Sequence, residues 1–286
     1  MNINNFGTLY IVATPIGNLR DITLRAIEIL KTVKKIAAED TRHSLSLLQH
    51  LAINTPMMAL HEHNELEKSD ELLSELQNGQ SIALISDAGT PLINDPGYIL
   101  VRKAREQGIK VVPIPGACAL IAALCASGLP TDRFVYEGFL PAKTKARIQH
   151  LETVAFETRT LIFYETPHRI LDCLKDMEKT LGGERRVVIA RELTKLHETI
   201  TDGTLTELVA WVSDDKNQQR GEIVLMVAGS SKTIKQSDSP ETDKILKVLL
   251  TELPLKQAVD LATKILDKRK NELYDRALEI KETLSS

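Results

Sequence analysis

The strongest constraint on the fold is an alternation of short apolar runs with helical patterns along residues 1–130. Runs of strand length cover residues 9–13, 35–38, 81–86 and 110–113. Between them, apolar residues recur at helical spacing, as Leu24, Ile27 and Leu30 do. Parallel strands need a crossover connection, which is usually a helix. The pattern predicts an α/β domain over residues 1–130 with a mainly parallel sheet.

The same spacing predicts the helices of this first domain, at residues 22–32, 45–51, 65–77, 98–106 and 117–126. The last of these is apolar along its whole length, so we expect it to be fully buried.

A second alternation follows the break at Gly128-Leu129-Pro130. Its predicted strands cover residues 134–137, 160–164, 186–190, 198–202 and 223–227, and its helices cover 145–154, 170–179 and 205–213. We therefore expect a second α/β domain over residues 131–230. Residues 231–286 are predicted to form a polar linker and a small module of three short helices, with Leu253-Pro254 between the first two.

Composition excludes several classes of protein. Apolar residues make up 43% of the 286, and 39 acidic against 36 basic residues give a net charge of −3. This argues against a disordered chain and against a globally basic nucleic-acid coat protein, although a local basic face is still compatible with it. Three scattered cysteines argue against a disulfide framework or a cysteine-rich metal site, so we expect no metal. No signal peptide or membrane span is expected, and the predicted location is the cytoplasm.

Unusual loops follow the predicted strands of the first domain. They are TPIGNLRD (14–21), EDTR (39–42), DAGTPLINDPG (87–97) and PIPGAC (113–118). Ligands of parallel sheets bind outside the carboxyl ends of the strands. The loop at 87–97 also exceeds the usual two to six residues of such a connection.

The type of ligand follows from what these loops lack. The glycine patterns typical of dinucleotide and ATP sites are absent, and neither 87–97 nor 113–118 contains Lys or Arg. A nucleoside-type ligand held by backbone groups fits better than a polyphosphate, and S-adenosylmethionine is such a ligand.

Seven motifs, in this order, resemble the tetrapyrrole methylase superfamily: VATPIGNLRDIT, EDTR, SDAGTPLINDPG, PIPGACALIAAL, YEGFLP, TLIFYETPHR and ARELTKLHE. More closely, they resemble its ribosomal branch, the ribosomal RNA small subunit methyltransferase I family. The resemblance implies two α/β domains with S-adenosylmethionine in the cleft between them, and a homodimer. It also implies 2′-O-methylation of a cytidine ribose in the decoding region of 16S rRNA, with the small ribosomal subunit as partner.

Two motifs depart from the family pattern. The family usually has Ser where this chain has Asn94, a change that keeps a hydrogen-bonding side chain. It usually has Pro-Ser where this chain has Ala117-Cys118, which removes a hydroxyl and puts a side-chain bond from position 118 to the cofactor in doubt.

The resemblance also implies which residues contact the cofactor. They are Pro15, Ile16, Ala88, Gly89, Thr90, Ile93, Cys118, Ala119 and Tyr164. Asp87 and Asp95 lie next to them in the sequence, where a carboxylate is compatible with a cationic sulfonium. For Asp95, a role as a turn or helix cap before Pro96-Gly97 is an equal alternative.

A ribose hydroxyl is a poor nucleophile and benefits from a general base. The candidates are carboxylates at the ends of the motifs: Glu39, Asp40, Glu165 and Glu192, with His168 as a further possibility. The sequence does not choose among them.

Arg42, Arg169 and Arg191 are candidates for binding RNA phosphates, because a guanidinium can hold phosphate with two bonds. Lys143, Lys145, Arg147 and His168 are further candidates. The alternatives are ion pairs such as Asp40–Arg42 and Arg191–Glu192, or a solvated helix face. For the function itself, a small-molecule methylase acting on a tetrapyrrole and a module that only binds its ligand are the alternatives.

Overall fold

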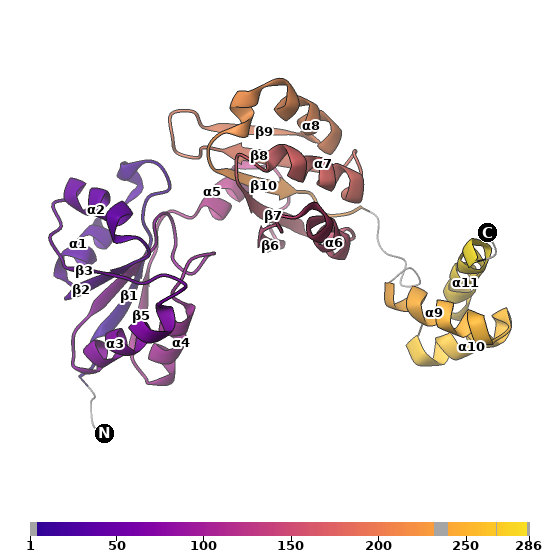
Figure 1. The fold of residues 1–286 in the computed structure, drawn as a ribbon, viewed down its shortest axis with the longest axis horizontal. Coiled ribbons are helices and arrows are strands. Elements are labelled where there is room, and N and C mark those ends of the chain that lie inside the picture. The colour runs from indigo at the N-terminus through magenta and orange to yellow at the C-terminus, as the bar shows by residue number, and fades with distance from the viewer. Residues whose placement is uncertain (1–4, 232–239, 267, 285–286) are drawn as a thin grey trace. The chain divides into compact units, whose positions relative to one another are not determined.

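The computed structural model describes residues 5–231, 240–266 and 268–284. The chain divides into two compact units. The larger comprises Met1–Glu152 and Arg159–Ala228, and the smaller comprises Thr153–Thr158 and Gly229–Ser286. The larger unit contains two β-sheets, which we call the first and second lobes (Figure 1).

The sheet of the first lobe is entirely parallel. Its order is β3-β2-β4-β1-β5, with the strands β1 (Thr8–Val12), β2 (Lys35–Ala38), β3 (Met57–Ala59), β4 (Ile82–Ile85) and β5 (Lys110–Ile114). The predicted parallel sheet is confirmed. The sequence pattern missed β3, because this edge strand has only three residues and none of them is fully buried.

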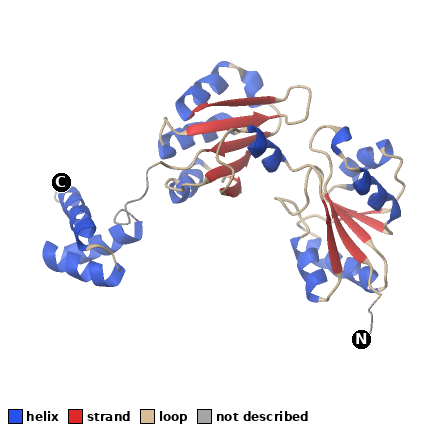
Figure 2. Cartoon of the chain, turned by 180° about the vertical axis from the view of Figure 1, so that it is seen from behind, coloured by secondary structure: helices blue, strands red, loops and turns tan. Residues whose placement is uncertain are grey.

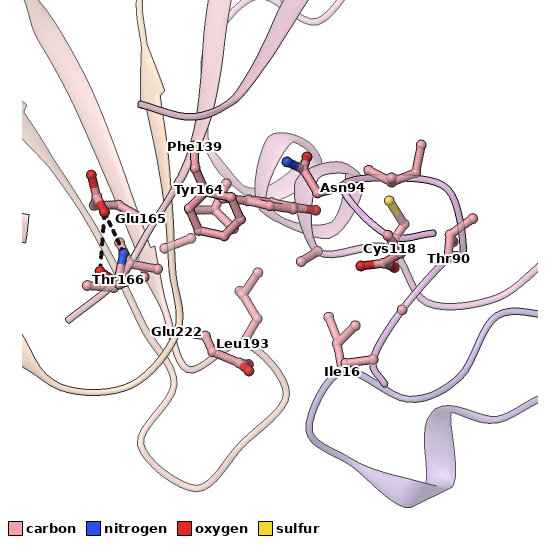
Figure 3. A pocket seen from close by; sticks show the side chains of 18 of the residues that line it. Ile16, Thr90, Asn94, Cys118, Phe139, Tyr164, Glu165, Thr166, Leu193 and Glu222 are labelled. Atoms are coloured by element: carbon pink, nitrogen blue, oxygen red, sulfur yellow. Dashed lines mark hydrogen bonds between the residues drawn. The ribbon is translucent and has the colours of Figure 1, made fainter. Parts of the chain in front are cut away.

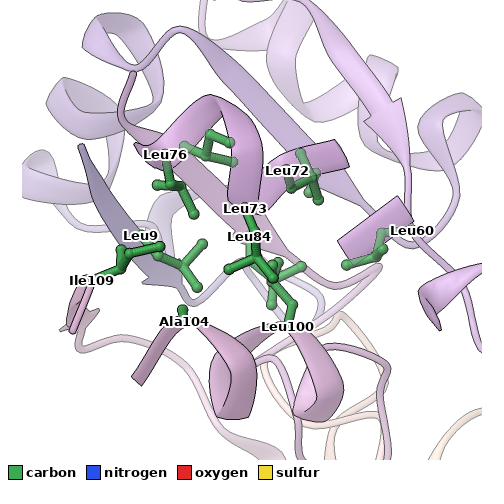
Figure 4. Close-up of a cluster of buried hydrophobic side chains, with 11 residues drawn as sticks. Leu9, Leu60, Leu72, Leu73, Leu76, Leu84, Leu100, Ala104 and Ile109 are labelled. Atoms are coloured by element: carbon green, nitrogen blue, oxygen red, sulfur yellow. The ribbon is translucent and has the colours of Figure 1, made fainter. Parts of the chain in front are cut away.

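Helices cover both faces of this sheet (Figure 2). On one face, α1 (Leu24–Thr32) and α2 (Thr41–His50) pack through residues such as Leu30 and Leu48 against Val12 and Ile36. On the other face, α3 (Glu65–Gln77) and α4 (Tyr98–Glu106) supply Leu72, Leu76 and Leu100 to a core with Leu9 and Leu84 (Figure 4). Burial of both faces explains why these strands are apolar throughout rather than alternating. A short 3₁₀ turn (Leu19–Asp21) lies between β1 and α1.

The sheet of the second lobe is mixed. Its order is β6-β7-β10-β8-β9, with β6 (Phe134–Phe139), β7 (Thr160–Glu165), β8 (Arg186–Arg191), β9 (Thr199–Thr204) and β10 (Ile223–Val227). Only the β6–β7 pair is parallel. Its helices are α6 (Thr144–Val154), α7 (Ile170–Leu181) and α8 (Leu205–Asp214), and a 3₁₀ turn (Lys216–Gln219) precedes β10.

Helix α5 (Ala119–Ala126) joins the two lobes, and the prediction that it is fully buried is wrong. Leu120, Ala123 and Leu124 pack on the second sheet in a core that also contains Ile16 of the first lobe. The opposite face is exposed, and 44% of Ile121 is accessible. The helix therefore presents an apolar surface to solvent.

The smaller unit contains α9 (Pro240–Glu252), α10 (Leu255–Leu266) and α11 (Lys270–Leu284), which confirms three helices with a break at Leu253-Pro254. Their core includes Leu246, Val259 and Leu273. Most of the predicted polar linker lies outside the described residues. Among the helices that the structure describes, none combines the length and apolar character needed to cross a membrane.

Candidate active site

Hydrogen bonds tie together three of the loops at the carboxyl edge of the first sheet. Thr14 and Gly89 exchange backbone bonds of 2.8 and 3.1 Å, which join the loop after β1 to the loop after β4. The hydroxyl of Thr90 donates to the carbonyl of Ala117 at 2.9 Å and so adds the loop after β5. These bonds fix the backbones of the three loops relative to one another.

The loop after β2 joins the same cluster through carboxylates. The amide of Asp40 donates to Asp87 Oδ1 at 3.1 Å, and the amide of Asp87 lies 3.5 Å from Glu39 Oε2. The EDTR and SDAG motifs are therefore in direct contact although they lie almost fifty residues apart in the sequence.

The long loop at residues 87–97 is held at its end by Glu65, the first residue of α3. The Glu65 carboxylate accepts bonds from the amides of Gly97 and Ile99, at 3.0 and 2.7 Å. Since Gly97 is the N-cap of α4 and has no side chain, Glu65 caps that helix from outside. The alternative role of Asp95 as a side-chain cap is not observed.

A cavity of about 490 Å³ opens in this unit beside the joined loops (Figure 3). That size falls within the range typical of small-molecule sites. Both lobes line the cavity: Ile16, Glu39, Ala88, Gly89, Thr90, Ile93, Asn94, Asp95, Cys118, Ala119, Phe139, Tyr164, Glu165, Thr166, Pro167, Ala190, Leu193, Glu222, Ile223 and Val224.

Two of the lining carboxyls have a raised pKa. Burial raises the pKa of Asp95 to about 6, against a hydrogen bond with Ser86 and with added repulsion from Glu39 and Asp87. Burial likewise raises the pKa of Glu39, although the Asp87 amide opposes this and the charges of Asp87 and Asp40 add to it. Both carboxyls therefore take up protons more readily than ordinary acidic side chains do.

Tyr164 forms part of the cavity wall on the second lobe. Its phenol oxygen accepts a bond from the amide of Leu120 at 3.2 Å, at the start of α5. Its ring packs edge-on against Tyr136 and Phe139, with centroids 5.1 and 5.7 Å away. Burial raises the pKa of Tyr164 to about 12, so the phenol stays neutral.

Glu165 lines the cavity, but its side chain is fully buried. It accepts a bond from the Thr166 amide at 2.7 Å and pairs with Arg169, which also donates to the carbonyl of Leu140. These contacts indicate that Glu165 orders the turn after β7.

Asp40 and Glu192 lie outside the cavity lining. Asp40 caps α2 and pairs with Arg42, whose hydrogen bonds hold the pKa of Asp40 well below its usual range. Glu192 is bonded to Lys195 at 2.8 Å. Burial acts to raise the pKa of Glu192, but the bonds from Lys195 and the Glu222 amide outweigh it and lower the pKa. Both groups are thus stabilised as anions, which weakens them as bases.

The candidate RNA-binding residues divide into two sets. Arg42, Lys143, Lys145 and His168 are exposed, and Arg42 is paired with Asp40 as the alternative interpretation expected. Arg147, Arg169 and Arg191 are wholly or partly buried in structural contacts. Only 3% of the Arg147 side chain is accessible, and it pairs with Asp176 at 2.6 Å. Because a buried, paired guanidinium cannot reach a phosphate, the position of Arg147 does not fit its predicted role.

Arg191 bonds to the carbonyl of His197 and the hydroxyl of Thr199, instead of forming the expected pair with Glu192. These contacts hold the segment that follows β8. Arg191 therefore has a structural position.

Most cavity-lining residues of the first lobe could be predicted from the sequence, whereas most of those of the second lobe could not. Ile16, Ala88, Gly89, Thr90, Ile93, Asp95, Cys118, Ala119 and Tyr164 were predicted to contact a ligand, and all line the cavity. Pro15 and Asp87 lie in the same loops but outside the lining set. Asn94, Phe139, Leu193 and Glu222 were missed, although the first three lie within motifs that the resemblance had marked. Among the described residues, no cluster of acidic, His and Cys side chains could hold a metal ion.

A family model described as "Tetrapyrrole (Corrin/Porphyrin) Methylases" matches residues 8–209. A protein of Pseudomonas aeruginosa named ribosomal RNA small subunit methyltransferase I is 57% identical over 96% of this chain and 97% of its own length. The chain belongs to the ribosomal RNA small subunit methyltransferase I family. The protein of that name from Escherichia coli O157:H7 is also 57% identical, over 96% of each chain.

Two further comparisons concern the C-terminal module and the fold. Residues 236–281 match a second model, described as "RsmI C-terminal HTH domain". A solved uroporphyrin-III C-methyltransferase from Thermus thermophilus, in complex with S-adenyl homocysteine, has a TM-score of 0.52 at 20% identity and covers 78% of this chain and 97% of its own. The family and the α/β tetrapyrrole methylase fold predicted from the sequence are confirmed.

Proposed function

We propose that this protein transfers a methyl group from S-adenosylmethionine to the 2′-hydroxyl of a cytidine ribose in the decoding region of 16S rRNA. The observation that carries the proposal is the cavity at the joined strand ends, where Glu39 faces a site of small and apolar residues. The names of the 57% identical relatives support ribosomal RNA as the substrate.

The cavity suits S-adenosylmethionine in size and chemistry. Gly89 and Ala88 admit a ligand close to the backbone, while Ile93 and Tyr164 offer apolar surface to an adenine or methionine chain. Asp95 supplies a carboxylate that is compatible with a sulfonium cation. Bound S-adenosylmethionine supplies a methyl group that is already activated by the positive sulfur. This chain therefore needs only to bind the cofactor, orient the ribose hydroxyl and remove its proton.

Glu39 is the best placed general base among the four candidates. It lines the cavity, its pKa is raised, and among the described residues it forms no ion pair. A raised pKa brings a carboxylate closer to the operating pH, where a base is most effective. Asp40 and Glu192 are held as anions by neighbouring cations, and Glu165 is bound by Arg169.

Four exposed cationic or titratable side chains fit contacts with RNA phosphates: Arg42, Lys143, Lys145 and His168. Arg42 lies at the start of α2, three residues after Glu39, and 90% of its side chain is accessible. Phosphate contacts position an RNA substrate without reading its sequence. We therefore assign these residues to holding the strand that contains the target ribose.

The exposed apolar face of α5 supports a homodimer. This helix is apolar along its whole length, and four of its residues are exposed: Ile121, Ala122, Cys125 and Ala126. A second copy of the chain would remove this surface from water, as obligate interfaces do. We propose that the protein acts as this dimer in the cytoplasm, on the small ribosomal subunit.

The test uses purified protein, methyl-labelled S-adenosylmethionine and small subunits from cells that lack this activity. The expected result is label in 16S rRNA that survives alkali as a dinucleotide, because a 2′-O-methyl group blocks cleavage of the adjacent phosphate. Label that alkali releases in mononucleotides would indicate methylation of a base. No transfer to subunits or free rRNA, with cofactor binding intact, would overturn the proposal and favour a tetrapyrrole substrate.

A further inference from the structure

Asn94 bridges the two lobes at the wall of the cavity. It lies in the loop after β4, and its side-chain oxygen accepts a hydrogen bond from the phenol of Tyr136 on β6. Asn94 also lines the cavity itself. The long loop of the first lobe is thereby fastened to the second lobe by one pair of side chains.

The backbone of β6 in the second lobe leaves space for the side chain of Asn94. The pairing of β6 with β7 shifts register between Tyr136 and Gly138, and Gly138 has a left-handed φ of +67°. A Cβ atom at position 138 would lie 3.1 Å from the Asn94 amide nitrogen. The bulge and the glycine thus leave room for the side chain that arrives from the first lobe.

The loop backbone needs such an anchor. Leu92 and Asn94 have φ values of +72° and +70°, a region that costs energy for residues other than glycine, although asparagine tolerates it best. The residues on either side of Asn94, which are Ile93 and Asp95, both line the cavity. Holding Asn94 in place therefore fixes the direction of two lining side chains.

Tyr136 is itself well positioned as a donor. Its ring packs against Tyr164 with a centroid distance of 5.1 Å, and Tyr164 is bonded to the start of α5. Burial raises the pKa of Tyr136 far above its usual value, with the nearby Tyr164 adding to the effect. The phenol consequently keeps its proton and remains a donor over the whole range of assay conditions.

We propose that Asn94 and Tyr136 are positioning residues for cofactor binding, which fasten the 87–97 loop to the second lobe and so hold Ile93 and Asp95 in their cofactor-binding positions. The inference rests on the proposed placement of S-adenosylmethionine in this cavity. Neither residue is assigned a contact with the reacting atoms.

Three variants of the full chain separate the hydrogen bond from backbone strain. Asn94→Gly removes the bond and accepts the positive φ, Asn94→Asp keeps an acceptor oxygen of the same shape, and Tyr136→Phe removes only the hydroxyl. The probe is S-adenosylhomocysteine, which carries no sulfonium charge, so a new carboxylate at position 94 has little direct effect on it. Its Kd is measured by calorimetry.

Asn94→Gly and Tyr136→Phe should each weaken binding by roughly three- to tenfold, the loss expected for one hydrogen bond. Asn94→Asp should bind within about twofold of the native protein. The double variant Asn94→Gly/Tyr136→Phe should bind no more weakly than Tyr136→Phe alone, because that variant already removes the bond to Asn94. In turnover, KM for S-adenosylmethionine should rise while kcat stays within about threefold.

Unchanged Kd in Tyr136→Phe, with only a lower melting temperature, would overturn the inference and leave the pair a purely structural contact. Additive losses in the double variant would also overturn it. If Asn94→Gly fails to fold, Tyr136→Phe still decides, since it keeps the packed ring.

A further variant, Ala119→Phe, fills the cavity and tests whether the cofactor binds there at all. Its result separates failure of the Asn94–Tyr136 inference from failure of the proposed cofactor position. If folded Ala119→Phe binds S-adenosylhomocysteine like the native protein, then the cofactor lies elsewhere and the placement itself is wrong.

Discussion

The carboxylate of Glu65 accepts a hydrogen bond from the amide of Ile99 at 2.7 Å, across the gap between α3 and α4. The same carboxylate accepts a second bond from the amide of Gly97, where the 87–97 loop ends and α4 begins. A residue outside the cavity lining thus sets where the 87–97 loop stops.

Replacing Glu65 with Ala should destabilise the protein by about 2 kcal/mol, because two amides at a buried helix start lose their acceptor. Urea unfolding measures the change. Glu67→Ala, at an exposed position of the same helix, is the matched control and should lie within about 0.5 kcal/mol of the native protein. Equal effects of the two substitutions would contradict the capping role.

Arg147 and Asp176 form a buried ion pair, with side chains 3% and 14% accessible. Arg147→Met should cost about 3 kcal/mol of unfolding free energy, since it leaves the Asp176 carboxylate without its partner. Lys145→Ala, two residues away and exposed, should change stability little but weaken binding to small subunits and flatten its salt dependence. Loss of subunit affinity in a folded Arg147→Met protein would return Arg147 to the RNA-binding set.

Asp95 should make the protein less stable as the pH rises. Its pKa is raised from 3.8 to about 6, so the folded state holds the proton more tightly than the unfolded state between these values. The contribution of this group to stability is present below about pH 4 and is lost as the pH rises through about 6. Asp95→Asn should therefore gain about 1–2 kcal/mol relative to the native protein at pH 8 compared with pH 4, after allowance for solvent screening. An equal difference at both pH values would show that Asp95 does not titrate in this way.

Ile121 should be central to the proposed dimer, because 44% of it is accessible on the apolar face of α5. Ile121→Glu should convert a dimer into a monomer by placing a charge at the interface, and light scattering after gel filtration measures the mass. Leu66→Glu, at a 64% exposed leucine of α3, is the control and should leave the dimer intact. A native protein that runs as a monomer would exclude the homodimer.

The sequence could predict the first-lobe loops of the site because ligands of parallel sheets bind at the carboxyl ends of the strands, and the family resemblance then named the contact residues within those loops. The loops that contain Gly89, Ile93 and Cys118 could be placed at one edge of the sheet without knowing any contact between them. The second lobe has a mixed sheet to which that rule does not apply. Resemblance named Tyr164, but Glu222 and Ile223 reach the cavity only through the antiparallel pairing of β10 with β7, which spans about sixty residues.

The tertiary partners of individual side chains were the hardest feature to predict from the sequence. Arg147 belongs to a lysine-rich helix start, so its spacing gives no sign that it turns inward to Asp176 on another helix. The same holds for Asn94, whose partner Tyr136 is forty-two residues away in the other lobe. Helix α5 was judged by its apolar composition, but one face of it is exposed. Such outcomes depend on tertiary contacts, which local patterns do not encode.

We infer that methyl transfer takes place in the cavity beside Glu39, with that carboxylate as the base. The most direct measurement compares single-turnover methyl transfer to small subunits by the native protein and by Glu39→Gln, with Glu192→Gln as the matched control. Glu39→Gln should lose about 10²- to 10⁴-fold in rate while its Kd for S-adenosylhomocysteine stays within about threefold, and Glu192→Gln should retain its rate. A rate for Glu39→Gln within about threefold of the native protein would show that Glu39 is not the base.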